Sequence, residues 1–243
     1  MSEFDDPALF GDRWAETYDG SGWEATVELD LLAELAAGGR VLELAIGTGR
    51  VGVPLARRGV VVEGIEASGA MVAKMRAKPG GADIPVVVGD MADVDVEGPF
   101  RMAYLVFNTL FNLTTQERQI DCFRNVANVL EPGGAFVVEC FVPDPTDWQK
   151  NQRVEARSVT ADAATINVYR HDALAQRYDK QTIIFDADGY RMLPTSLRYS
   201  WPSEIDLMAR LAGLHLTDRY GDWDRRPFTD GSTSHISVYR KSA

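Results

Sequence analysis

Short apolar runs that alternate with helical patterns constrain this chain more than any other feature of its sequence. Between residues 40 and 145 the apolar runs occupy 41–45, 60–65, 84–88, 102–107 and 135–141. Continuous apolar character is typical of strands that are buried on both faces. The intervening segments place apolar residues at helical spacing, as in Ile120, Phe123 and Ala127. This order predicts an α/β fold with a doubly wound, mostly parallel sheet and helices on both faces.

The pattern changes after Pro143. Residues 149–199 alternate in polarity, and Asp188-Gly189 favours a tight hairpin turn. We therefore expect an antiparallel β insertion after the fifth strand, which covers the substrate or contacts a second copy in a homodimer. A last helix from Ser203 and strands at 215–220 and 234–240 bring the sheet to seven strands. The core then comprises 24–148, beginning with a helix over 24–37, and 200–243.

Composition excludes several classes of protein. The formal net charge of −11 disfavours nucleic acid and anionic membranes as partners. Two cysteines, Cys122 and Cys140, indicate free thiols and a cytoplasmic protein. The acidic first residues do not resemble a signal peptide, and no apolar run is long enough to span a membrane. Three histidines without CxxC or HExxH spacing predict no metal site.

A glycine turn, Gly47-Thr48-Gly49, directly follows the first predicted strand and opens a helix. Glycine lets a ligand approach the backbone, and this edge of a doubly wound sheet is where ligands bind. With Gly52 the run also satisfies GxGxxG, which nicotinamide-dependent enzymes share. The turn alone therefore predicts a cofactor site without selecting the cofactor, and a turn with no ligand is the alternative.

Three acidic residues near strand ends help to identify which cofactor the turn would bind. Glu43 lies inside an apolar strand, where a charge needs a partner. A carboxylate under the turn would repel a pyrophosphate but suits S-adenosylmethionine, which is a cation. Glu66 ends the second strand, where an acid can accept hydrogen bonds from ribose hydroxyls of either cofactor. Asp90, followed by Met91, either accepts from an adenine amino group or caps a loop.

Four ordered motifs together resemble the class I S-adenosylmethionine-dependent methyltransferases, in particular bacterial small-molecule and peptide N-methyltransferases. The motifs are Glu43-Leu44-Ala45-Ile46-Gly47-Thr48-Gly49, Gly64-Ile65-Glu66-Ala67-Ser68 with Met71, Gly89-Asp90-Met91 and Leu130-Glu131-Pro132-Gly133-Gly134. The resemblance covers about 40–145. Ala45 stands where glycine is common, and Glu66 replaces a frequent aspartate.

The resemblance implies a Rossmann-like fold and a set of residues that contact S-adenosylmethionine. It implies that Glu43 or the turn backbone contacts the methionine amino group of the cofactor. It also implies that Glu66 binds the ribose and that Asp90 and Met91 contact the adenine. The full cofactor set is Tyr18, Glu43, Ala45, Gly47, Gly49, Glu66, Ala67, Met71, Asp90, Met91, Phe107 and Asn108.

The acceptor site is expected beside the cofactor. Residues 1–23 resemble the lid segment of small-molecule methyltransferases, in which an aromatic side chain can close over a sulfonium. The fourth strand lacks the Asn/Asp-Pro-Pro-Tyr/Phe motif, which argues against nucleic-acid bases as acceptors. The candidate general bases are Tyr18 and His235. The candidate substrate contacts are Trp14, Asn112, Phe141 and Arg225.

These features predict in-line methyl transfer from S-adenosylmethionine to a small-molecule acceptor, with an amine as the expected nucleophile and a role in secondary metabolism. The alternatives are an O-methyltransferase acting on a phenol or hydroxyl, a non-catalytic protein that binds the cofactor, and an NAD-dependent oxidoreductase.

Overall fold

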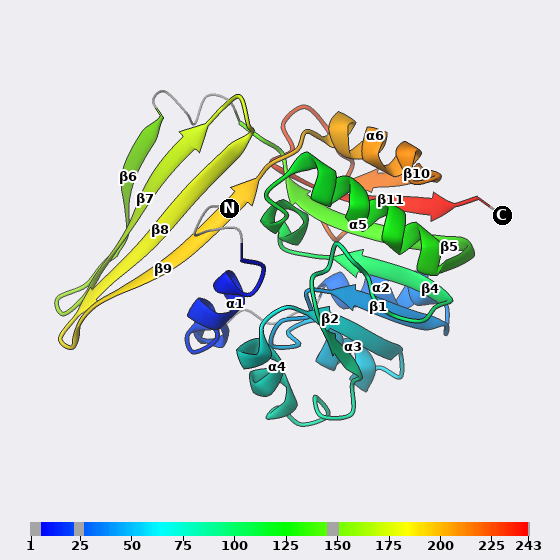
Figure 1. Cartoon of the computed structure of the whole chain (residues 1–243), viewed down its shortest axis with the longest axis horizontal. Helices are drawn as coiled ribbons and strands as arrows, with labels where there is room; N and C mark the ends of the chain where they lie inside the picture. The colour runs from blue at the N-terminus through cyan, green and yellow to red at the C-terminus, as the bar shows by residue number, and fades with distance from the viewer. Residues whose placement is uncertain (1–5, 22–26, 145–150, 243) are drawn as a thin grey trace.

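The computed structural model describes residues 6–21, 27–144 and 151–242, and its centre is a seven-stranded sheet (Figure 1). The strand order is β10-β11-β5-β4-β1-β2-β3. Strands β1 to β5 pair in parallel, whereas β11 is antiparallel to β5 and β10. The bounds are β1 (Arg40–Leu44), β2 (Val61–Glu66), β3 (Val86–Val88), β4 (Phe100–Leu105), β5 (Leu130–Phe141), β10 (Leu214–Tyr220) and β11 (Ser234–Lys241). The predicted fold class is confirmed.

Helices cover both faces of this sheet and explain its apolar strands. One buried cluster joins the sheet to α5 and α6, with Phe123 and Met208 as examples. The other joins the opposite face to α2 and α3, through Leu32 and Val53. The helices are α2 (Val27–Ala36), α3 (Gly52–Arg57), α4 (Gly69–Arg76), α5 (Gln116–Val129) and α6 (Pro202–Leu211). The start of the helix expected over 24–37 lies outside the described residues.

Strand β5 begins five residues earlier than the sequence predicts. We expected Pro132-Gly133-Gly134 to separate helix from strand, but α5 passes into β5 at Leu130. Gly133 has a φ of +75°, and the register with β4 shifts between Phe100 and Met102. The irregular stretch therefore lies within the strand, because pairing with Phe100 begins before the glycines.

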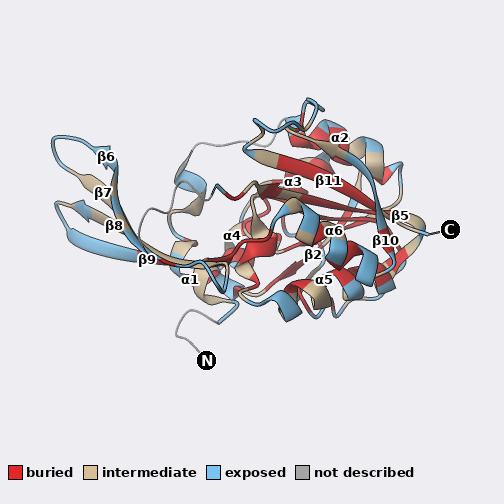
Figure 2. Ribbon diagram, turned by 90° about the horizontal axis from the view of Figure 1, so that it is seen from above, coloured by how far each residue is buried: buried red, intermediate tan, exposed pale blue. Residues whose placement is uncertain are grey.

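The insertion forms a separate antiparallel sheet of four strands in sequence order: β6 (Gln152–Val159), β7 (Ala164–Asp172), β8 (Arg177–Asp186) and β9 (Gly189–Arg198). Asp186 pairs with Gly189 across the tight turn that Asp188-Gly189 predicts. The sheet projects from the core, and its burial is concentrated in β9, where it meets the rest of the chain (Figure 2).

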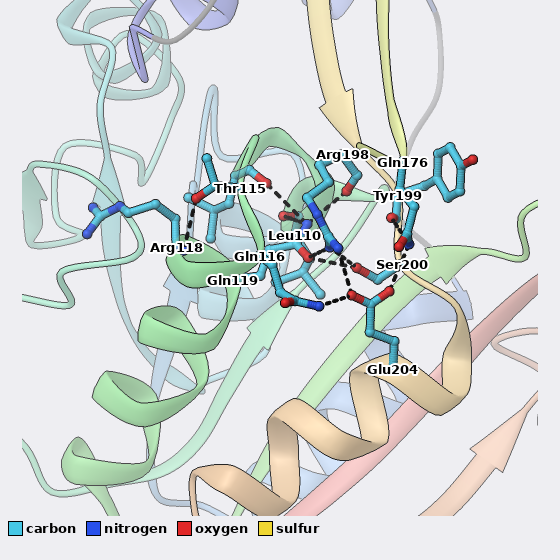
Figure 3. A network of polar contacts seen from close by, with 11 residues as sticks. Leu110, Thr115, Gln116, Arg118, Gln119, Gln176, Arg198, Tyr199, Ser200 and Glu204 are labelled. Carbon is cyan, nitrogen blue, oxygen red and sulfur yellow. Dashed lines mark hydrogen bonds and ion pairs between the residues drawn. The ribbon is translucent and has the colours of Figure 1, made fainter. Parts of the chain in front are cut away.

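A buried polar network fixes β9 to the core (Figure 3). The guanidinium of Arg198, which is 6% exposed, donates to Gln119 Oε1 at 2.8 Å and pairs with Glu204 at 2.7 Å. Gln119 Nε2 in turn donates to the carbonyls of Leu113 at 3.1 Å and Arg198 at 2.8 Å. A buried charge is tolerated when it is paired and hydrogen-bonded in this way. The network thus joins the end of the insertion to α5, α6 and the segment around Leu113.

The N-terminal segment packs between the insertion and the core. It contains α1 (Leu9–Trp14) and the short 3₁₀ helix η1 (Tyr18–Ser21). Trp14 Nε1 donates to the carbonyl of Pro194 in β9 at 3.2 Å. Gly11 approaches α4 so closely that a Cβ there would lie 2.3 Å from the Cβ of Ser68. In the part of the chain that the structure describes, no helix is long and apolar enough to cross a membrane.

Candidate cofactor and acceptor site

A cavity opens at the carboxyl ends of β1 and β2, under the N-terminal segment. Most of the residues predicted to bind the cofactor line it: Tyr18, Ala45, Gly47, Glu66, Ala67, Met71, Asp90 and Met91. Asn112, a predicted substrate contact, lines it as well. Parallel strands end at a common edge, and this brings together residues that are far apart in the sequence.

The glycines of the turn have different roles. Gly47 has a φ of +58°, and the nearest atom to a Cβ built there is a backbone oxygen at 3.9 Å. Gly49 has a φ of +73°, and a Cβ there would lie 2.6 Å from Met75 Cγ and 2.7 Å from Val53 Cγ2. Gly47 therefore keeps the backbone open beside the cavity, whereas Gly49 permits close packing below the turn and does not line the cavity.

Glu66 is held in place by the backbone around it. Its Oε2 accepts the N–H of Gly47 and its Oε1 accepts the N–H of Ser68, both at 2.8 Å. Burial raises the pKa of this carboxyl, while the backbone donors act in the opposite direction. Each carboxylate oxygen retains a second lone pair. Glu66 is thus a fixed acceptor on the wall of the cavity and suits a ribose diol.

Glu43 lies beneath the turn and does not line the cavity. It is 2% exposed, and its Oε2 lies 2.4 Å from where a Cβ of Gly52 would be. Burial raises its pKa to about 8, and the charge of Glu66 adds to this. We expected a charged carboxylate here, but a pKa of about 8 leaves the buried side chain largely neutral at pH 7. Its Oε2 makes no hydrogen bond within the described structure.

The raised pKa of Glu43 predicts how stability depends on pH. The unfolded carboxyl ionises near pH 4.5, whereas the folded one keeps its proton up to about pH 8. The native state binds more protons than the unfolded state over this interval. The free energy of unfolding therefore falls, through this group, by about 1.4 kcal/mol for each unit by which the pH rises. Glu43→Gln removes the titration. In urea titrations we expect the free energy of unfolding of Glu43→Gln, relative to that of wild type, to increase steadily from pH 5 to pH 8. A difference that does not vary with pH would contradict the assignment.

Asp90 caps a loop, which is one of the two roles that the sequence left open, and it also lines the cavity. Its Oδ1 accepts the N–H of Ala92 at 2.8 Å, which caps the loop. Its Oδ2 pairs with Arg118 at 3.0 Å. The same residue lines the cavity next to Met91, whose side chain is 8% exposed. This end of the cavity therefore offers an acceptor beside an apolar surface.

The N-terminal segment closes the cavity from above. Tyr18 and Phe10 line it, and their rings meet edge to face at 6.1 Å. Thr48 in the glycine turn donates to Asp19 Oδ1 at 2.7 Å, and Lys78 pairs with Asp19 at 2.9 Å. Burial raises the pKa of the Tyr18 hydroxyl. The raised pKa favours the protonated form of Tyr18 at neutral pH, in which the hydroxyl is a hydrogen-bond donor.

Several residues that line the cavity were missed in the sequence. Phe10 precedes Trp14 by one helical turn, and this aromatic spacing could have suggested it. Thr109, at the start of η2 (Thr109–Asn112), follows the fourth strand closely. The wall is completed by a segment of β9, Pro194, Thr195 and Ser196. No sequence signal marks this segment, because its position depends on how the insertion packs on the core.

The remaining predicted residues lie outside this cavity. Arg225 pairs with Glu34 on the surface. Trp14 anchors α1 on β9. Phe141 lines a second cavity at the base of the insertion and packs edge to face on Phe111, with ring centroids 4.8 Å apart. Phe107 and Asn108 follow the end of β4 and do not line the cavity.

His235 is the clearest departure from the sequence analysis. It is fully buried within β11, and its Nδ1 lies 2.8 Å from Ser237 Oγ. Burial lowers its pKa to about 4. It does not line the cavity, so its position does not support the role of general base. The histidine was selected from its place at a strand start, but its side chain points into the packed interior.

A doubly wound sheet with a cavity at the carboxyl ends of its strands is typical of proteins that bind a nucleoside or nucleotide cofactor. Comparison with known proteins gives the class. A methyltransferase domain family matches residues 41–134. The CcbJ methyltransferase from Streptomyces caelestis is 39% identical, with 98% of this chain and all of that chain covered and a TM-score of 0.90. The chain belongs to the S-adenosylmethionine-dependent methyltransferases, and S-adenosylmethionine is its cofactor. This excludes the oxidoreductase and the non-catalytic alternatives.

Two further proteins extend the comparison. The cypemycin N-terminal methyltransferase of Streptomyces is 29% identical over 245 residues, which cover 97% of this chain and 99% of that protein. CalS10 of Micromonospora echinaspora, an amino pentose methyltransferase involved in calicheamicin biosynthesis, shares the fold with a TM-score of 0.69. Its identity is 21%, with 94% of this chain and 96% of that chain covered.

The cavity fits the cofactor by its own chemistry. Glu66 presents a carboxylate already oriented by two backbone donors. Met71 and Met91 supply apolar surface, and Asp90 supplies an acceptor at the same end. These residues would hold the ribose and adenine, and the open backbone at Gly47 would lie beside the methionine part.

Proposed function

We propose that this methyltransferase acts on the amine nitrogen of a small-molecule or peptide-like acceptor in secondary metabolism. The observation that carries the proposal is the charge of the cavity. Of the described residues that line it, the ionisable ones are Asp6, Tyr18, Glu66 and Asp90, and none is His, Lys, Arg or Cys. Such a wall attracts a cationic amine, and it offers no imidazole, amine or thiol that could serve as a base.

The lack of a suitable base favours nitrogen over oxygen. When bound, S-adenosylmethionine supplies a methyl group activated by its sulfonium. A hydroxyl acceptor must lose its proton to become a good nucleophile, which calls for a general base. Burial raises the pKa of Tyr18, which favours its protonated form at neutral pH. Both oxygens of Glu66 accept backbone N–H groups, and the oxygens of Asp90 accept the N–H of Ala92 and pair with Arg118. A neutral amine attacks with its own lone pair, and the product ammonium then releases its proton to water.

The protein's own part is to position the acceptor and exclude water. Tyr18 and Phe10 cover the cavity, while β9 closes it from the side. Asn112 and Thr109 offer polar groups where an acceptor could be oriented. The names of the cypemycin and amino pentose enzymes support an amine acceptor, because each points to an amine-bearing substrate.

Paired acceptors test this proposal. Peptides with a free N-terminal alanine are compared with the same peptides beginning in lactic acid, and benzylamine with benzyl alcohol, using S-adenosylmethionine with a labelled methyl group. We expect label only in the amines. We also expect rates that rise with pH as the acceptor amine deprotonates, and the same pH dependence in Tyr18→Phe. Label in the hydroxyl compounds, or a pH profile that changes with Tyr18→Phe, would instead support O-methylation with Tyr18 as base.

A further inference from the structure

Two consecutive residues at the end of β4 adopt a left-handed backbone. Phe107 has a φ of +57° and Asn108 a φ of +64°. Residues other than glycine rarely adopt this conformation, and bulky ones adopt it only where the surroundings impose it. Thr109, the next residue, lines the cofactor cavity. The pair therefore immediately precedes, in the chain, a residue of the cavity wall.

Strand β5 holds this pair through three hydrogen bonds. A side-chain oxygen of Glu139, Oε2, accepts the N–H of Phe107 at 2.8 Å. The backbone carbonyl of Glu139 accepts the N–H of Asn108 at 3.3 Å. Asn108 Oδ1 accepts the N–H of Phe141 at 2.5 Å. The side chain of Glu139 thus bonds the backbone of Phe107 directly.

The ring of Phe107 is connected to the cavity through Arg50. The guanidinium of Arg50, just after the glycine turn, lies over the ring of Phe107 with its Cζ 5.4 Å from the centroid. The same Cζ lies 4.9 Å from the ring centroid of Tyr18. Cations within about 6 Å of an aromatic ring centroid are attracted to it. Arg50 therefore links Phe107 to Tyr18, which lines the cavity.

We propose that Glu139 is a positioning residue for methyl transfer. Its carboxyl fixes the backbone of Phe107, so that the Phe107 ring and Arg50 hold Tyr18 against the methyl-bearing end of the cofactor. Glu139 does not line the cavity and acts only through these residues. The inference rests on Tyr18 lying at that end of the cofactor, and it is independent of the acceptor.

The test compares two ligands that differ by the methyl group and its positive charge. Calorimetric titrations with S-adenosylmethionine and S-adenosylhomocysteine need no acceptor, so their outcome is separate from the amine proposal. In Glu139→Ala we expect the Kd of S-adenosylmethionine to rise about 10-fold and that of S-adenosylhomocysteine by less than about threefold. Glu139→Gln keeps an acceptor oxygen and should stay within about threefold of wild type for both ligands. Equal changes for the two ligands in Glu139→Ala, or none, would overturn the proposal.

Three further variants separate positioning from a purely structural role. Phe107→Leu keeps the backbone but removes the ring, and should reproduce the selective loss even if Glu139→Ala does not fold. Glu131→Ala, at the other end of β5, removes a surface pair with Arg101 and should change neither Kd. In a Tyr18→Ala background, Glu139→Ala should cause no further selective loss, because both act on one contact. Additive losses, or an unchanged Phe107→Leu, would contradict the proposal.

Discussion

The Glu66→Ala variant is expected to bind S-adenosylhomocysteine roughly 100-fold more weakly than wild type. Two effects combine in this loss. The variant loses the oriented acceptor on the cavity wall, and the backbone N–H groups of Gly47 and Ser68 lose the partner that orients the turn, to which they donate at 2.8 Å. A hydrogen bond to a charged group contributes about 1.5–3 kcal/mol, and each 1.4 kcal/mol of lost ligand contact corresponds to a factor of ten in Kd.

A matched control lies on the same strand. Glu63 is also in β2, but its carboxylate pairs with Arg40 at 2.6 Å, away from the cavity. Glu63→Ala should leave the Kd for S-adenosylhomocysteine within about twofold of wild type, as expected for a partly exposed ion pair. Calorimetry on both variants, with circular dichroism to verify folding, decides the matter. A Glu66→Ala protein that binds within threefold of wild type would remove Glu66 from the cofactor site.

Gly11→Ala is expected to lower kcat/KM by about 10- to 50-fold with little loss of stability. The added Cβ would lie 2.3 Å from Ser68 Cβ and 2.9 Å from Ser68 Oγ. Ser68 cannot move aside easily, because its hydroxyl caps α4 by accepting the N–H of Met71 and donates to Asp12 at 2.6 Å. Helix α1 must therefore shift, and it carries part of the cover over the cavity. Small displacements of positioning groups can cost up to about 100-fold in rate.

The same segment provides the control for this substitution. Gly20 lies in η1, and a Cβ built there meets nothing within 4 Å. Gly20→Ala should therefore retain activity within about twofold. Both variants add one methyl group in the same segment, but only the one at Gly11 would meet Ser68 and Met71 beside the cavity. Steady-state kinetics beside thermal unfolding measure the two effects, and equal activities for the two variants would show that the docking of α1 does not matter.

The sequence was sufficient for the sheet and for bringing most of the predicted site residues to one cavity, because both follow from local patterns along the chain. Apolar runs mark strands that are buried on both faces, and the acids that follow them meet at one edge wherever the strands are parallel. Glu66 and Asp90 could be placed in this way. Ser68 directly precedes a helix, a position that favours a serine cap, and it accepts the N–H of Met71 there.

What the sequence did not reveal depends on distant contacts. Gly11 matters only because α1 meets Ser68, and Pro194 belongs to the wall only because β9 packs beside α1. The charge of Glu43 was inferred from its type, whereas its protonation depends on how deeply the fold buries it. His235 was placed near the site by its position in the chain, but the direction of its side chain is set by pairing between β11 and β5.

A crystal structure with S-adenosylhomocysteine is the most direct test of this account. We expect the ribose hydroxyls within hydrogen-bonding distance of Glu66, the adenine beside Met91 and Asp90, and the sulfur facing Tyr18. A product bound elsewhere, or one whose ribose does not contact Glu66, would contradict the assignment of the cofactor cavity and the roles derived from it.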